Sequence, residues 1–200
     1  MCDWRKGHFM KKDLINVYDF DKTIYDGDST ADFYMYCLKH HPFIALRWPQ
    51  LAFYFLLFTL QMITKTAFKE KMYRFLRFVP DVETAIDDFW KTHQKKIKGW
   101  YLDQKQDSDL ISSASPDFLL NDICRNKLGV RLIASIVDAK TGLYTGLNNH
   151  GAEKVKRLNE EYPHFEINNF YSDSLSDAPL AKIAKKSYLV DGDVIKDWPK

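Results

Sequence analysis

The chain has 200 residues, of which 46% are hydrophobic, and its formal net charge is +2 at pH 7. This length is enough for one core domain with an insertion, built around a substantial hydrophobic core. The small net charge excludes the strongly basic surface of a typical nucleic-acid-binding protein, so we expect no nucleic-acid partner. Cys2, Cys37 and Cys124 lack the spacing of a metal site, and no signal-peptide pattern precedes Leu14. Both features favour reduced thiols and a cytoplasmic protein.

The first predicted strand covers Leu14 to Tyr18 and leads directly into Asp19-Phe20-Asp21-Lys22-Thr23. Residues two apart on a strand share a face, so Asp19 and Asp21 are expected to point into one small volume beyond the strand's carboxyl end. Two carboxylates this close repel each other unless a cation neutralises them or one of them holds a proton. Both conditions suit phosphoryl-transfer chemistry.

A long insertion of helical composition, residues 26–99, separates this strand from the next. Within it Pro42 to Ile63 is strongly apolar, and residues 51–60 carry no charge. A helix needs about 20 apolar residues to cross a bilayer, so this segment is too short. An apolar helix must still be covered, and the candidates are the insertion's own interior, a dimer partner or a membrane surface.

The stretch that follows is basic, with aromatic and aliphatic residues between its charges. Such a pattern is typical of a helix at a membrane interface, but it also fits an ordinary helix with one solvated charged face. Both interpretations stay open from the sequence. The basic residues, opposed only by Glu70, are Lys65, Lys69, Lys71, Arg74 and Arg77.

The second half of the chain alternates short β-rich runs with helical patterns. The run Leu110 to Ser113 reads as a buried strand ending in hydroxyls, with Pro116 placed to begin a helix. Residues 130–147 suggest a strand, a turn at 140–142 and a short return strand. Further strands are predicted at Leu132 to Val137, Ile167 to Tyr171 and Ser187 to Val190, and residues 191–193 look like a turn.

Two more groups of polar residues accompany these elements. Lys154 lies in the first turn of a helix predicted from Gly151 to about Glu161, where the helix dipole disfavours a cation unless an anion is bound nearby. Asp173 and Asp177 follow the strand that ends at Tyr171. Strands that alternate with helices predict a parallel sheet with helices on both faces, and ligands of such sheets bind beyond the carboxyl ends of the strands.

In these motifs the sequence resembles the haloacid dehalogenase superfamily of phosphohydrolases, in particular the branch that includes phosphoserine phosphatase and phosphatidylglycerophosphatase C. The resemblance rests on Asp19 to Thr23, Ser113, Lys154, and Asp173 with Asp177, and so spans nearly the whole chain. It implies an α/β fold with a Rossmann-like parallel sheet and an inserted all-helical cap. The implied core comprises residues 1–25 and 100–200, and the implied cap comprises residues 26–99.

The resemblance also implies a role for each matching residue. Asp19 would be the nucleophile and Asp21 the general acid and base, while Ser113 and Lys154 would bind the phosphoryl group. Ser112 competes with Ser113, and the family's pattern favours Ser113. Mg²⁺ would be held by Asp19, Asp173 and the main-chain carbonyl of Asp21, with Asp177 nearby and Thr23 supporting the loop.

Asp28 stands where phosphoserine phosphatases place a glutamate that meets the substrate's amine. It is one methylene shorter than glutamate, and it also fits a simpler role at the start of a helix that Ser29 would cap. Lys22 replaces a glycine or serine found in many relatives and is expected to be a solvated loop residue.

We therefore expect a Mg²⁺-dependent phosphomonoester hydrolase. Its leading substrate class is an amphiphilic or lipid phosphate such as phosphatidylglycerophosphate. The sequence leaves open whether the cap makes peripheral contact with the inner face of the membrane. Phosphoserine or another small phosphorylated metabolite is the alternative, and a non-catalytic binding module with the same fold is a distant one. An open apolar groove near Leu51 to Leu60 would favour a lipid. A small closed pocket with one arginine and Asp28 would favour an amino-acid phosphate. The oligomeric state is not determined.

Overall fold

The structure, a computed structural model, describes residues 13–199, so the expectations for Cys2 and the N-terminal segment lie outside the described residues. Six strands form one sheet in the order β3-β2-β1-β4-β5-β6. All neighbouring pairs are parallel except β5 and β6. The predicted α/β fold class is thereby confirmed. The strands are β1 (Asp13–Tyr18), β2 (Leu110–Pro116), β3 (Arg131–Ser135), β4 (Phe165–Ser172), β5 (Lys186–Asp191) and β6 (Val194–Asp197).

Strand β1 lies inside the sheet, between β2 and β4, and its side chains are buried on both faces. Ile15, Val17 and Tyr18 are almost fully buried, as expected for a strand covered on both sides. β1 pairs with β2 on one side and with β4 on the other, so the strand order reverses at this point. Such a reversal opens a crevice at the carboxyl ends of the strands, and the chain enters it at Asp19.

Helices cover both faces of this sheet. On one side lie α7 (Ala152–Glu161) and α8 (Ala178–Ile183), and on the other lies α6 (Asp117–Asn121), which continues as one turn of π-helix at Asp122–Lys127. Pro116 is the N-cap residue of α6, which confirms that a helix begins beside it. The antiparallel strand β6 was not predicted, and the expected turn at 191–193 connects it to β5.

The insertion between β1 and β2 is helical, and its division from the core at residues 26–99 stays a prediction. Side-chain caps at Asp28, Thr64 and Asp81 begin three of its helices, each satisfying a backbone N–H that would otherwise lack a partner. Its elements are α1 (Ser29–His40), a 3₁₀ turn (Pro42–Arg47), α2 (Trp48–Thr59), α3 (Lys65–Tyr73), a 3₁₀ turn (Arg74–Phe78), α4 (Val82–His93), a 3₁₀ turn (Gln94–Lys96) and α5 (Gly99–Gln104).

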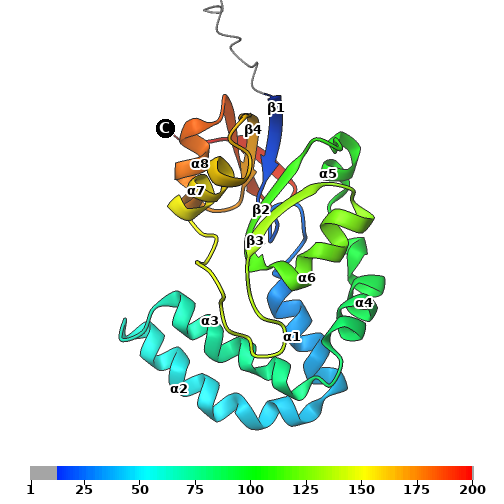
Figure 1. The fold of residues 1–200 in the computed structure, drawn as a ribbon, viewed down its shortest axis with the longest axis vertical. Coiled ribbons are helices and arrows are strands. Elements are labelled where there is room, and N and C mark those ends of the chain that lie inside the picture. Colours follow the sequence, from blue (N-terminus) through cyan, green and yellow to red (C-terminus); the bar gives the residue numbers. More distant parts are fainter. Residues whose placement is uncertain (1–12, 200) are drawn as a thin grey trace, which may run out of the picture.

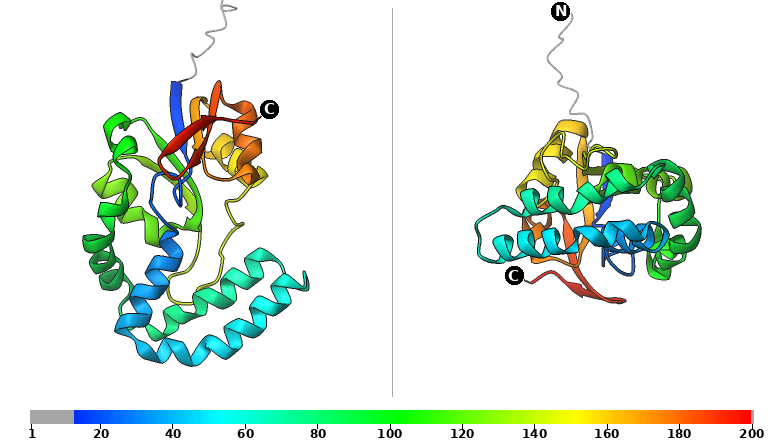
Figure 2. Two further views of the ribbon diagram at one scale, coloured as in Figure 1. Left: turned by 180° about the vertical axis from the view of Figure 1, so that it is seen from behind. Right: turned by 90° about the horizontal axis from the view of Figure 1, so that it is seen from below.

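Helices α2 and α3 form a pair on the side of the molecule away from the sheet (Figures 1 and 2). No residue of α2 is fully buried, so α3, whose Phe68 packs against Phe55 and Phe58, covers this apolar helix only in part. Its side chains Phe53, Phe55 and Leu56 each leave more than half of their surface exposed. Among residues 13–199, no helix is long and apolar enough to cross a membrane.

An aromatic cluster joins the insertion to the loop that follows β1. The ring of Phe20 stacks on Tyr25 and meets Trp90 edge-on, with centroid distances of 5.6 and 6.1 Å. Phe33 of α1 packs against Phe89 of α4 at 5.4 Å. Buried aromatic contacts of this kind contribute beyond their apolar area, so the loop that carries Asp19 and Asp21 is held against α1 and α4.

A second connection is made by residues 136–151, which leave β3, run along α3 and return to α7 (Figure 1). The return strand predicted here is wrong in extent, because only the pair Val137 and Tyr144 forms a β-bridge. The backbone N–H of Tyr144 instead donates to Glu70 Oε1 of α3 at 3.2 Å. The segment therefore bonds to itself, for example from the N–H of Thr145 to the carbonyl of Ile136, and also to the helix of the insertion.

Candidate active site

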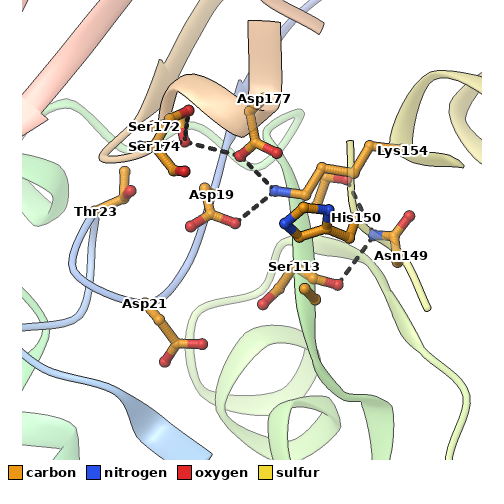
Figure 3. A network of polar contacts seen from close by, with 12 residues as sticks. Asp19, Asp21, Thr23, Ser113, Asn149, His150, Lys154, Ser172, Ser174 and Asp177 are labelled. Carbon is orange, nitrogen blue, oxygen red and sulfur yellow. Dashed lines mark hydrogen bonds and ion pairs between the residues drawn. The ribbon is translucent and has the colours of Figure 1, made fainter. Parts of the chain in front are cut away.

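A buried lysine lies between two carboxylates at the carboxyl end of β1 (Figure 3). Lys154 Nζ donates to Asp19 Oδ1 and to Asp177 Oδ2, each at 2.7 Å, and only 2% of its surface is exposed. Burial alone would lower the pKa of Lys154, but the charges of Asp19 and Asp177 raise it above its ordinary value. The ammonium that the helix dipole disfavours is thus stabilised by two acids from other elements.

The ion pair with Lys154 does not fully stabilise the ionised form of Asp19. Burial raises its pKa to about 7; the Lys154 ammonium opposes that increase, and the carboxylates of Asp177 and Asp21 add to it. The backbone N–H of Asp19 donates to the carbonyl of Tyr171 on β4 at 2.9 Å. This bond to the neighbouring strand fixes the position of the Asp19 backbone. A further positive charge near its carboxylate would stabilise the ionised form.

The two acids that follow β4 are placed by hydroxyl groups. Ser172 Oγ donates to Asp177 Oδ2 at 2.8 Å, and the backbone N–H of Asp173 donates to Thr23 Oγ1 at 2.9 Å. Thr23 is fully buried, and its supporting role in the site stays a prediction. Burial raises the pKa of Asp173, while the charge of Lys22 opposes the increase.

Asp21 lies apart from this ion pair and has its own set of partners. The backbone N–H of Ser29, the first residue of α1, donates to Asp21 Oδ1 at 2.6 Å, and Ser115 Oγ donates to Asp21 Oδ2 at 2.5 Å. Burial raises the pKa of Asp21 to about 6, and the charge of Asp28 adds to this while both hydrogen bonds oppose it. A carboxyl group with such a pKa can both give and take a proton near neutral pH.

The choice between the two serines of β2 follows from the direction of their side chains. Ser113 lines the cavity that holds the acids, whereas Ser112 is absent from its lining. Ser112 Oγ instead accepts a hydrogen bond from Asn149 Nδ2 at 3.3 Å, and the same amide donates to the carbonyls of Ser113 and Ile133. The Asn149 side chain thus links the end of β2 to β3 by hydrogen bonds.

One cavity of about 360 Å³ brings together most of the residues that the sequence singled out. Thr23 lies outside its lining. The predicted residues that line the cavity are Asp19, Asp21, Asp28, Ser113, Lys154, Asp173 and Asp177.

One sequence interpretation in this region needs correction, and the interpretation of Lys22 as a solvated loop residue is extended. Asp28 rather than Ser29 is the N-cap residue of α1, because Asp28 Oδ1 accepts the backbone N–H of Ala31 at 2.9 Å. Lys22 is exposed but also lines the cavity, with a left-handed backbone at φ 58°. This conformation is strained for any residue except glycine and is common at functional sites.

Sequence reasoning missed three residues of the site. Ser115 shares a strand face with Ser113, so the same two-residue period that paired Asp19 with Asp21 could have found it. Asn149 and His150 precede α7 and carried no recognisable signal. His150 lines the cavity, and burial together with the charge of Lys65 lowers its pKa.

The donor set fits a hard divalent cation that keeps part of its own hydration. In residues 13–199, no three His, Cys, Asp or Glu side chains are grouped to hold a metal ion. The cavity does present Asp19 and Asp173, and Asp173 forms no ion pair with a described residue. Mg²⁺ is usually bound by one or two carboxylates, with waters and substrate phosphate completing its shell.

Solved structures with the same fold come from several bacteria. A protein of unknown function from Bordetella pertussis Tohama I is 19% identical, with a TM-score of 0.68 over 88% of this chain and 89% of that one. A phosphoserine phosphohydrolase-like protein from Francisella tularensis subsp. tularensis SCHU S4 is 15% identical, with a TM-score of 0.54 over 88% and 85% of the two chains.

No curated protein matches the sequence. The model of the haloacid dehalogenase-like hydrolase family matches residues 17–182, a range that holds every residue of the site. The motifs that carried the resemblance in the sequence therefore identified the right superfamily. The chain belongs to the haloacid dehalogenase-like hydrolase family.

Proposed function

We propose that the protein is a Mg²⁺-dependent phosphomonoester hydrolase that acts through an aspartyl-phosphate intermediate. The observation that supports it most is the pairing of Asp19 with a buried ammonium in a cavity that also holds a separately bonded, protonatable Asp21. A nucleophile and an acid with different environments are what a two-step displacement needs.

In the first step, a carboxylate oxygen of Asp19 attacks phosphorus while Lys154 donates to Asp19 Oδ1. The new oxygen–phosphorus bond forms as the ester bond breaks, and Asp21 gives its proton to the leaving alkoxide. Lys154 and the Ser113 hydroxyl stabilise the phosphoryl oxygens. In the second step, water attacks the same phosphorus and Asp21 takes a proton from that water. The bond between phosphorus and Asp19 breaks, and phosphate is released.

The cation site of this proposal consists of the carboxylates of Asp19 and Asp173 with the main-chain carbonyl of Asp21. A bound Mg²⁺ supplies positive charge that lowers the repulsion between the nucleophile and the phosphoryl oxygens. Asp177, which is bonded to Lys154 and Ser172, holds the lysine in place beside the nucleophile.

The proposed substrate is an amphiphilic phosphate ester. An apolar groove of about 350 Å³ lies along α2 and is lined by Trp48, Leu51, Ala52, Phe55 and Phe68. Phe68 also lines the catalytic cavity, so an apolar chain can follow the groove while its phosphate reaches Asp19. No arginine lines this cavity within the described residues, and Asp28 is used to cap α1, which favours the amphiphile over an amino-acid phosphate.

We also propose that the exposed apolar surface around α2 rests on an anionic membrane. Burial lowers the pKa of Arg47, which directly precedes α2, and the charges of Arg74 and Arg77 lower it further, so these three guanidinium groups lie near one another. Cations beside exposed apolar side chains suit a surface of anionic lipids. The exposed apolar side chains of this surface are Phe43, Leu46, Phe53, Leu56, Leu60 and Met62.

Hydrolysis of p-nitrophenyl phosphate by the full chain, with and without Mg²⁺, tests the reaction. We expect Asp19→Asn to lose more than about a thousandfold in kcat/KM, because the nucleophile is gone. Acid-quenched wild-type protein should also carry labelled phosphate from a labelled substrate. Asp103→Asn removes an exposed carboxylate outside the cavity and is the control. Equal activity of the two variants would contradict the proposal.

Octyl phosphate compared with ethyl phosphate tests the substrate class. Each buried methylene contributes about 0.8 kcal/mol, so we expect a kcat/KM at least about tenfold higher for the octyl ester. Phe55→Ser should reduce that advantage and leave ethyl phosphate unchanged. The control is Met35→Ser, which removes an equally exposed apolar side chain on α1, outside the groove. An octyl ester no better than the ethyl ester would contradict an apolar chain in the groove.

A further inference from the structure

Two lysines of the insertion face the catalytic cavity from successive turns of α3. Lys65 and Lys69 are four residues apart, so they lie on one side of the helix, and both line the cavity that contains Asp19. Lys69 Nζ donates to the carbonyl of Ala114 at 3.0 Å, one residue beyond Ser113. The Lys69 ammonium is therefore anchored beside the proposed phosphoryl site.

Lys65 reaches the same cavity from its rim. Its Nζ lies 3.3 Å from Nε2 of His150, and because an ammonium can only donate, the imidazole nitrogen accepts. The lowered pKa of His150 is consistent with a neutral ring in this contact. The loop before α7 thus contacts the exposed Lys65 side chain at the rim of the cavity.

The positive charge of these lysines is not neutralised by a direct partner. Neither lysine forms an ion pair with any residue of the range 13–199. Like charges four residues apart destabilise a helix, and lysines near its N-terminus oppose its dipole. Burial and the charge of Lys65 lower the pKa of Lys69 to about 8, although Asp21, Asp28 and Asp19 act in the opposite direction.

The hydrogen bond to Ala114 accounts for one of the three N–H donors of Lys69. Phe68, which precedes Lys69, and Met72 also line the cavity, so α3 presents both cationic and apolar side chains to it. A leaving group with one anionic group and an apolar portion would match both.

We propose that Lys65 and Lys69 form a subsite for a second anionic group, a carboxylate or a phosphodiester, carried by the leaving group of the phosphomonoester. This subsite rests on the phosphatase function proposed above. It narrows the substrate class to phosphomonoesters with a further negative charge close to the phosphate that is removed.

A matched pair of esters tests the subsite. 3-Phosphoglycerate differs from glycerol 3-phosphate in having a carboxylate in place of a hydroxymethyl group. We expect about tenfold tighter binding and a correspondingly lower KM for 3-phosphoglycerate, because its carboxylate gains charge-assisted hydrogen bonds. Lys65→Gln/Lys69→Gln should bring the ratio close to one and change glycerol 3-phosphate less than about threefold.

Lys71→Gln is the control, since it removes the same charge from the same helix but lies outside the cavity, against the ring of Tyr54. Lys65 is exposed, so Lys65→Gln alone should fold even if the double variant folds poorly. It should show a smaller preference for 3-phosphoglycerate over glycerol 3-phosphate than the unmodified protein. A second pair, phosphatidylglycerophosphate and phosphatidic acid in mixed micelles, distinguishes a phosphodiester from a carboxylate. If the Lys65→Gln/Lys69→Gln variant loses the preference for the doubly anionic ester in either pair, the subsite is supported.

Equal losses for both members of each pair would place the lysines on the phosphoryl group itself and overturn the proposal. So would the absence of any preference in the unmodified protein. Calorimetric binding to full-length Asp19→Asn protein gives the same ratios without turnover. If no ester is hydrolysed but the lysine-dependent binding ratio persists, the proposed function fails and the anion subsite stands.

Discussion

At the scale of single residues, the site depends on how a few charges are balanced in a buried place. Lys154, Asp19 and Asp177 bring one positive and two negative charges together with almost no exposed surface. Breaking a buried ion pair by removing one partner costs more than the pair contributes, because the remaining charge keeps its desolvation penalty. The three residues should therefore behave as a unit.

We predict that Lys154→Met lowers the free energy of unfolding by about 3 kcal/mol at pH 7.5 in EDTA, because two carboxylates lose their partner. Urea denaturation measures it. Lys156→Met, on the same helix but with an exposed ammonium 3.9 Å from its nearest acids, should change the value by less than about 0.5 kcal/mol. Adding Asp177→Asn to Lys154→Met should recover part of the loss. Similar values for the two lysine variants would show that the buried pair does not hold the site together.

The environment of Asp21 leads to a second residue-scale prediction. If Asp21 protonates the leaving group, Asp21→Asn should slow hydrolysis of an alkyl phosphate by about 10² to 10⁴-fold. The effect on p-nitrophenyl phosphate should be much smaller, because nitrophenolate leaves without a proton. Steady-state kcat/KM for the two esters measures the contrast. Equal losses for both would assign Asp21 a role other than proton transfer.

At the scale of elements, the position of the insertion depends on close backbone contacts with the core. Gly142, in the turn of the segment 136–151, has φ 72°, and a Cβ built there would lie 2.6 Å from the backbone carbonyl carbon and oxygen of Tyr73. The rings of Tyr73 and Tyr144 face each other nearby, with centroids 6.1 Å apart. The C-terminal end of α3 is thus packed directly on this turn.

Gly142→Ala should therefore destabilise the protein more than a positive φ alone explains. Gly129 has a similar φ of 69°, but a Cβ at this residue would have no atom within 4 Å, so Gly129→Ala isolates the backbone cost of about 1 to 2 kcal/mol. We expect Gly142→Ala to exceed that value by at least about 1 kcal/mol because the turn or α3 must shift. Urea denaturation of both variants measures the difference. Equal losses would mean that the turn moves freely away from α3.

At the scale of the whole molecule, the apolar groove along α2 and the proposed catalytic cavity share one lining residue, Phe68. Leu46 and Leu60 leave 77% and 60% of their surface exposed. Apolar patches of this kind on a monomer indicate an interaction surface. A bilayer that covers α2 would place the groove, and through Phe68 the cavity, at the level of lipid headgroups.

We predict that the protein sediments with anionic vesicles and less with neutral ones, because the arginines beside α2 favour negative lipids. Leu46→Ser/Leu60→Ser should weaken the association by about tenfold or more, since burial of two leucines is lost. Met35→Ser/Leu102→Ser removes two exposed apolar side chains from α1 and α5 and should leave it unchanged. Binding that is insensitive to the first pair would exclude α2 as the contact.

Much of the architecture could be read from local patterns. The strands before Asp19 and Asp173 were placed within two residues, because short apolar runs with a following turn favour buried strands. The helix from 152 to 161 was placed almost as closely, since its apolar positions repeat with the helical period. The return strand after β3 and the edge strand β6 were not read correctly. Their pairing depends on which neighbour is available, as the bond from Tyr144 to Glu70 illustrates.

The sequence by itself identified the family and the candidate acids, because the order of the motifs matches the family model and a two-residue period predicts that Asp19 and Asp21 point the same way. Only the tertiary structure decided which partner each group meets. Lys154 and Asp19 are 135 residues apart in the chain, and Asn149 turns Ser112 away from the cavity that Ser113 lines. Lys65 and Lys69 looked like a solvated or membrane-facing charge pattern until the packing of α3 placed them over the cavity. Local periodicity encodes the direction of a side chain relative to its own element, whereas contacts across the chain depend on how the elements pack.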